Sequence, residues 1–404
     1  MSNTDFIVRS SVPRRCFREL ESPKHAVANL APNWYASVMG TGIVANAAAS
    51  LPLQFPGLRA AATVVWTLAG TLLLVLTAAT AAHWRRFGHI ARGHLLHPVT
   101  AHFYGAPAMA LMTVGAGALL LGRDMLGVRA ACLIAAVLWT LGTGLGLVSA
   151  VLVPYLAFTR FAFARDAAFA GWLMPVVPPM VSAATGALLL PYLPAGQWRA
   201  TMLWCGYGMF GISLIASLII VTLVWSRLAH HKTGPAGMVP TLWIVLGPLG
   251  QSVTAANLLG DHAHLAVADT RALEALGVVY GVPVLGFALL WAAIALAVTV
   301  RTARDGLPFN LTWWSFTFPV GTCVTGASAL ASHTGAVVFA VLAVVLYAGL
   351  VSAWATVAVR TFHGAVITGR LLAPAARPHT GDEVRPAAGS ATRGTGRSRP
   401  SGAR

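Results

Sequence analysis

The sequence predicts an all-α membrane protein with ten transmembrane helices. Charged residues make up only 9% of the 404 positions, and hydrophobic residues make up 57%. Soluble proteins carry about 25% charged residues, so a soluble domain of this composition could not cover its own surface. The mean hydropathy is +0.73, and the apolar residues fall into runs long enough to cross a bilayer. These observations exclude an ordinary cytosolic enzyme.

The apolar runs are separated by polar loops, most of them short. Backbone groups inside lipid must be satisfied within their own segment, so each run is expected to be a helix. The expected spans are residues 33–52, 58–83, 102–121, 130–153, 171–190, 199–226, 238–259, 275–300, 311–331 and 335–359.

The positive charges are distributed unevenly between the two sides of such a protein. The two termini and the even-numbered loops carry 22 of the 27 lysines and arginines, and the odd-numbered loops carry five. The positive-inside rule then predicts a plasma-membrane protein with both termini in the cytoplasm. The expected organisation is a cytoplasmic arm over 1–31, a transmembrane domain over 32–360 and a cytoplasmic tail over 361–404. The tail is rich in Pro, Gly, Ser and Arg and is expected to be disordered from about residue 372.

The odd-numbered spans differ from the even-numbered ones. Even spans are uniformly apolar, whereas odd spans carry glycine, proline and small polar residues in a weak repeat of about 70 residues. Such helices suit a protein interior, so we expect five bent inner helices around a central path and five outer helices facing lipid. The alternative is that small residues only allow tight helix packing. The candidate pore-lining or helix-bending residues are Gly40, Thr41, Gly42, Pro107, Pro175, Pro178, Pro179, Pro248, Gly250, Gln251, Thr317 and Pro319.

The expected path carries no fixed charge. No Asp, Glu, Lys or Arg lies deep in any span, which argues against buried proton relays and against an intramembrane catalytic or metal site. We therefore predict no cofactor. A pathway without fixed charge binds its solute weakly, which suits rapid passage, and the cytoplasmic cations favour an anion as the solute. His333, just beyond the ninth span, is the better candidate for a titratable residue at the mouth.

Three motifs carry a family resemblance. The stretch PNWYASVMGTGIV from Pro32 to Val44 resembles the first-helix signature of the tellurite-resistance/dicarboxylate transporter family, which includes malate permeases, sulfite efflux pumps and slow-type anion channels. LGPLGQ, from Leu246 to Gln251, and WWSFTFP, from Trp313 to Pro319, resemble its later signatures. The resemblance covers about residues 30 to 360.

The resemblance implies five helical hairpins in quasi-five-fold arrangement around a pore, and often a homotrimer with one pore per protomer. In the channel branch a phenylalanine before the proline of a similar TFP triplet closes the pore, which points to Phe318 here. The alternative for Phe318 is an ordinary packed aromatic residue.

Several functions remain open at this point. Transport of a small anion is favoured, with a C4-dicarboxylate such as malate, or sulfite, ahead of tellurite, chloride or nitrate. A structural or sensory membrane protein that uses its basic tail for a partner or for anionic lipid is a second possibility. An intramembrane enzyme would need a catalytic pair, which the spans lack. The high pI is explained by basic loops at the membrane, so no nucleic-acid partner is expected.

Overall fold

The computed structural model describes residues 25–373, and these residues contain helices but no strand. The predicted arm over 1–31 is described only from His25, where a short helix, α1 (His25–Ala28), begins. The tail predicted to be disordered lies outside the described residues, apart from its first two positions.

Five long helices correspond to the even-numbered expected spans. They extend a few residues beyond most of the predicted boundaries because polar residues continue the helices past the apolar runs. They are α3 (Leu58–Arg86), α7 (Val128–Thr159), α9 (Gln197–His231), α11 (Arg271–Arg304) and α13 (Val337–Phe362).

The five odd-numbered spans are built differently, and all in the same way. Each begins as a 3₁₀ helix, which then gives way to an α-helix. The pairs are η1 (Pro32–Tyr35) with α2 (Ala36–Ser50), η2 (Thr100–Tyr104) with α5 (Gly105–Gly117), η4 (Ala170–Leu173) with α8 (Pro178–Ala187), η6 (Ala236–Val245) with α10 (Leu246–His262), and η8 (Leu311–Phe316) with α12 (Phe318–Thr334).

Short helical elements continue or connect these ten segments. A π-helical turn η3 (Ala118–Gly122) and α6 (Arg123–Leu126) continue α5. The others are α4 (Gly88–Leu95), η5 (Leu190–Tyr192), η7 (Ala263–Leu265), η9 (His363–Ile367) and η10 (Arg370–Leu372).

The two kinds of segment differ sharply in burial. In the two long odd-numbered segments, 83% and 89% of the most apolar stretch is buried, against 11–33% in the five long helices. Most residues of α2, α8 and α12 are buried as well. The long helices therefore surround the odd-numbered segments, as the residue pattern predicted.

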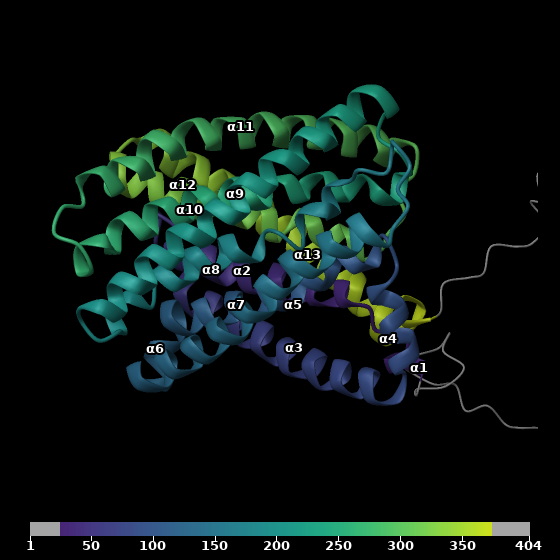
Figure 1. The fold of residues 1–404 in the computed structure, drawn as a ribbon, viewed down its shortest axis with the longest axis horizontal. Helices are drawn as coiled ribbons and strands as arrows, with labels where there is room; N and C mark the ends of the chain where they lie inside the picture. The colour runs from purple at the N-terminus through teal and green to yellow at the C-terminus, as the bar shows by residue number, and fades with distance from the viewer. Residues whose placement is uncertain (1–24, 374–404) are drawn as a thin grey trace, which may run out of the picture. The chain divides into compact units, whose positions relative to one another are not determined.

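The buried helices contact one another in a closed order. α2 packs on α5, α5 on α8, α8 on α10, α10 on α12, and α12 returns to α2. The 3₁₀ helices repeat this order, because η1 contacts η2, η2 contacts η4, η4 contacts η6, η6 contacts η8 and η8 contacts η1. Each long helix covers the junction between its own buried partner and the next one, as α3 does for α2 and α5. Figure 1 shows α2, α5 and α8 among the surrounding long helices.

The prolines expected to bend the odd-numbered segments stand near or in the first turn of the α-helices, whereas Pro240 lies inside the 3₁₀ helix η6. Pro178 and Pro179 open α8, and Pro319 is the second residue of α12. A proline in a first turn removes no intrahelical hydrogen bond, because the N–H there has no partner in the helix. The segments therefore change helix type at these prolines, where the sequence had suggested a bend in mid-helix. Prolines in mid-helix occur instead in two outer helices, as Pro154 of α7 and Pro283 of α11.

Close approach of α10 and α12 depends on Gly250. A Cβ atom at this position would meet the backbone of Thr322 and Cys323 on α12. Gly40 likewise allows α2 to approach Thr317 and Trp314 closely, because a Cβ atom at Gly40 would meet the side chains of these two residues. These contacts explain why α10 and α2 need glycine at these two positions.

Seven helices within residues 25–373 are long and apolar enough to cross a membrane. These are the five long outer helices and the segments Thr100–Leu126 and Ala236–Leu265. The remaining three expected spans are α2, α8 and α12 with their 3₁₀ helices. Their α-helical parts have 15, 10 and 17 residues, so each is shorter than any of the seven long helices.

Candidate functional site

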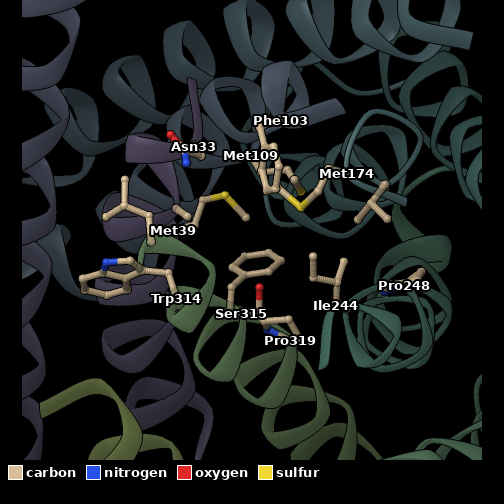
Figure 2. Close-up of a pocket in the computed structure, with 15 residues that line it drawn as sticks. Asn33, Met39, Phe103, Met109, Met174, Ile244, Pro248, Trp314, Ser315 and Pro319 are labelled. Carbon is tan, nitrogen blue, oxygen red and sulfur yellow. The ribbon is translucent and has the colours of Figure 1, made fainter. Parts of the chain in front are cut away.

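Two cavities lie between the five buried segments. The first has a volume of about 30 Å³ and is enclosed mainly by methionine, aromatic and aliphatic side chains. A cavity needs about 10–15 Å³ to hold one water molecule, so this space admits little more than that. Figure 2 shows Met39, Met109, Met174 and Ile244 around this common space, with Trp314 beside it. The residues come from all five buried segments: Asn33, Ala36, Met39, Phe103, Met109, Met174, Val177, Ile244, Gly247, Pro248, Leu311, Trp314, Ser315, Phe318 and Pro319.

The second cavity is ten times larger, at about 300 Å³, and is much more polar. Its lining contains two titratable groups, the carboxylate of Asp261 and the imidazole of His333, and many hydroxyl and amide groups. All five buried segments contribute to it: Ile43, Asn46, Ser50, Thr113, Ala116, Leu120, Val181, Ala184, Thr185, Leu188, Gln251, Thr254, Leu258, Asp261, Phe318, Thr325, Ser328, Ala329, Ser332 and His333.

Phe318 is the one residue that borders both cavities. Its side chain is 5% exposed, and it begins α12 directly before Pro319. The small apolar cavity and the large polar cavity are thus separated in part by a phenyl ring at the 3₁₀-to-α junction of the ninth expected span.

The polar lining follows a helical period that the sequence analysis did not use. On α10 the lining residues Gln251, Thr254, Leu258 and Asp261 are spaced by three or four positions, which places them on one helix face. The same spacing recurs as Ile43, Asn46 and Ser50 on α2, as Thr113, Ala116 and Leu120 on α5 and η3, and as Thr325, Ser328 and Ser332 on α12. Small polar residues at this spacing are the signal that could have predicted the large cavity.

Most hydroxyl groups of the large cavity donate to backbone carbonyls. Thr113 Oγ1 donates to Met109 O at 2.7 Å, and Ser328 Oγ donates to Val324 O at 2.8 Å. Gln251 differs, because its buried side chain forms no hydrogen bond within residues 25–373 although it borders the cavity. A primary amide has two N–H donors. Gln251 can therefore donate to a solute that carries negative charge.

The sequence-predicted site residues fall into two groups. Phe318, Pro319, Pro248 and Gln251 border a cavity. The others lie in helix contacts away from both linings: Gly40, Thr41, Gly42, Pro107, Pro175, Pro178, Pro179, Gly250 and Thr317. The residues missed by the sequence analysis are the methionines of the small cavity and the polar residues of the large one, apart from Gln251 and the mouth candidate His333.

The contacts of this second group are specific. Thr41 Oγ1 accepts a hydrogen bond from Trp354 Nε1 of α13 at 3.1 Å. Thr317 is fully buried, and its hydroxyl donates to Trp314 O at 2.7 Å. A Cβ atom on Gly42 would lie 2.8 Å from Thr113 Cγ2. These residues set how the helices pack around the cavities.

The proline group contributes backbone contacts. Pro175 O accepts from Ser149 Oγ of α7 at 3.2 Å, and Pro178 O accepts from Ser182 Oγ at 3.1 Å.

Within the described part of the chain, no three His, Cys, Asp or Glu side chains come together to hold a metal ion.

Comparison with known proteins gives a consistent result. The family model described as voltage-dependent anion channel (SLAC1) matches residues 29–362. An uncharacterized transporter of Methanocaldococcus jannaschii is 28% identical over 310 residues, which cover 76% of this chain and 85% of that protein. The sulfite efflux pump SSU1 of Arthroderma otae is 28% identical over 325 residues, covering 78% and 86%, and that of Trichophyton rubrum is 26% identical over the same length.

Proposed function

The chain belongs to the SLAC1 family of voltage-dependent anion channels, and from that premise we propose that it carries small anions across the plasma membrane. One observation carries the proposal. The same five buried segments enclose two cavities, and the two cavities meet at a single residue, Phe318. A path of this kind has its narrowest, driest part on one side of the phenyl ring and a polar chamber on the other.

The proposal includes ten membrane crossings in a quasi-five-fold arrangement. The closed order of contacts among α2, α5, α8, α10 and α12 supports it. A 3₁₀ helix rises about 2.0 Å per residue against about 1.5 Å in an α-helix, so segments that are partly 3₁₀ reach further than their length suggests. Both termini lie in the cytoplasm in this arrangement, and the large cavity opens to the outside. A homotrimer with one path per protomer is part of the same proposal.

Sulfite and a C4-dicarboxylate such as malate are the proposed solutes. The similarity to sulfite efflux pumps supports sulfite. The large cavity offers the free amide donors of Gln251, and an anion accepts hydrogen bonds from such groups without needing a fixed positive charge. Chloride, nitrate or tellurite is the second candidate. The apolar lining of the small cavity supports chloride and nitrate, because a monovalent ion loses less hydration free energy there than a dianion does.

Phe318 is the proposed gate of this path. The small cavity beside it is too small for a hydrated anion, and a narrow apolar constriction blocks ions by excluding water. A phenyl ring moves aside by rotation about two side-chain torsions, so the barrier can be lifted without moving the backbone.

The function is tested by measuring anion flux in proteoliposomes. Purified protein in vesicles is expected to take up labelled sulfite or malate along a gradient, and a panel with nitrate, chloride and tellurite ranks the solutes. Protein that reconstitutes as a folded species but moves none of these anions would contradict the proposal.

Ser332→Cys tests whether the large cavity is part of the path. Ser332 borders this cavity near its open end, so a charged thiol reagent that cannot cross the membrane is expected to reach the cysteine from outside and remove most of the flux. Ala195→Cys is the matched control, because Ala195 is exposed in the loop before α9, on the same predicted side of the membrane, and does not border the cavity. Full flux after labelling of Ser332→Cys would show that the cavity is not part of the path. Loss of flux only when the reagent is added inside would show that the large cavity opens to the cytoplasm.

A further inference from the structure

The large cavity contains one carboxylate and one imidazole, and they contact each other. His333 Nε2 lies 2.6 Å from Asp261 Oδ1. The side chain of Asp261 is 40% exposed and that of His333 is 18% exposed. The pair joins the C-terminal ends of α10 and α12 at the mouth of the cavity.

The hydrogen bonds of His333 determine where its protons lie. His333 Nδ1 is 2.9 Å from Ala329 O. A backbone carbonyl only accepts, so Nδ1 must carry a hydrogen. The contact between Nε2 and a carboxylate oxygen needs a second hydrogen between the two atoms. The pair therefore holds one shared proton and is electrically neutral as a unit. Loss of that proton leaves one negative charge at the mouth.

Other titratable and charged groups near this end of the molecule do not border the cavity. His264 Nδ1 bonds Asp261 O at 2.7 Å, and His262 Nδ1 bonds Leu258 O at 2.9 Å. α2 and α8 carry no charged residue, and α13 carries none before Arg360. The remaining groups lie in the other loops and helix ends on this side: Arg59 pairs with Asp124, Arg123 donates to Tyr192, Arg129 is exposed on α7, Arg199 donates to Leu193 O, Arg271 pairs with Asp269, and Glu274 accepts from Thr270. Among the residues that line the large cavity, Asp261 and His333 are the two that can carry charge.

We propose that Asp261 and His333 form a filter for the valence of the anion. With the shared proton in place, the mouth is neutral and admits singly and doubly charged anions. Without it, the carboxylate of Asp261 repels anions, and because Coulomb energy is proportional to charge, a dianion is repelled twice as strongly as a monoanion. The filter discriminates between species such as hydrogensulfite and sulfite, or between the two ionised forms of a dicarboxylate.

This inference rests on the proposed function, because it assumes that anions pass the mouth. The test uses two anions whose own charge does not change near neutral pH, nitrate as the monoanion and sulfate as the dianion. The measured quantity is the ratio of sulfate flux to nitrate flux in proteoliposomes. The ratio does not depend on how much folded protein each preparation contains.

His333→Gln replaces the imidazole by a group that cannot carry a proton to the pair, so the carboxylate of Asp261 stays uncompensated. The sulfate-to-nitrate ratio is expected to be about tenfold lower than in the unmodified chain at the same pH. The double change His333→Gln with Asp261→Asn removes the charge and is expected to restore the ratio of the unmodified chain.

Asp269→Asn is the control for a carboxylate outside the cavity. Asp269 is exposed and paired with Arg271, whose hydrogen bonds lower the pKa of Asp269, and its replacement is expected to leave the ratio unchanged. If His333→Gln keeps the ratio of the unmodified chain, or if the double change fails to restore that ratio, the filter is wrong. Absence of flux of nitrate, sulfate, sulfite and malate alike in the unmodified chain would instead overturn the proposed function.

Discussion

Phe318→Ala is expected to raise anion flux per folded protein by at least about tenfold, the effect of lowering a barrier by about 1.4 kcal/mol. The ring borders the small apolar cavity and the large polar one, so its removal joins the two and lets water enter the narrow part. Phe318→Leu keeps part of the volume and is expected to give an intermediate rate. The measurement is flux in proteoliposomes, normalised to the protein recovered as a monodisperse species in size-exclusion chromatography.

The competing explanation treats Phe318 as a packed core residue, and truncation of such a residue costs about 3–5 kcal/mol. Phe210→Ala is the matched control, because Phe210 is buried against Tyr280 and borders neither cavity. This change is expected to lower the yield of folded protein without raising flux per molecule. If Phe318→Ala behaves like Phe210→Ala in both measurements, Phe318 is not the gate.

Gly40→Leu is expected to abolish the folded, conducting protein. A Cβ atom at Gly40 would overlap the side chains of Thr317 and Trp314, and overpacking in a close-packed interior costs about 1–3 kcal/mol even for smaller insertions. Since Trp314 also borders the small cavity, any protein that does assemble is expected to conduct poorly. Yield after size-exclusion chromatography and flux per molecule are the two measurements.

Gly144→Leu provides the comparison, with the same change in side chain on an outer helix. Gly144 is exposed on α7, and a Cβ atom there would meet nothing within 4 Å. Yield and flux are expected to match those of the unmodified chain. Equal loss in both variants would mean that inner and outer helices tolerate bulk alike, contrary to the difference in their burial.

The division into inner and outer helices could be predicted from the sequence because it depends on composition. Runs such as TLLLVLTAAT in α3 suit lipid, whereas Gly250 and Pro319 lie in segments that other helices surround. The change from 3₁₀ to α-helix could not be predicted, because a proline in a first turn and a proline at a bend have the same sequence context until the hydrogen bonds of the preceding residues are known.

The site was harder to predict than the fold. Serine and threonine in membrane helices commonly bond the carbonyl four residues earlier, so Thr113 or Ser328 alone indicates nothing about a cavity. Thr41 has the same character in the sequence but turns toward Trp354 on α13. Which face of a helix points inward depends on its rotation, and that rotation is fixed by contacts between segments far apart in the chain.

A hydrogen bond joins the first buried helix, α2, to the last outer helix, α13. Thr41 on α2 and Trp354 on α13 are 313 positions apart, and a ribosome adding about 5–20 residues per second separates their synthesis by about 15 to 60 seconds. During that interval, one side of α2 has no permanent partner. The early hairpins must therefore remain in the membrane while this side of α2 is uncovered. A chain truncated before α12 would never cover it. Biogenesis of this chain is expected to depend on whatever factor shields α2 until the final hairpin arrives.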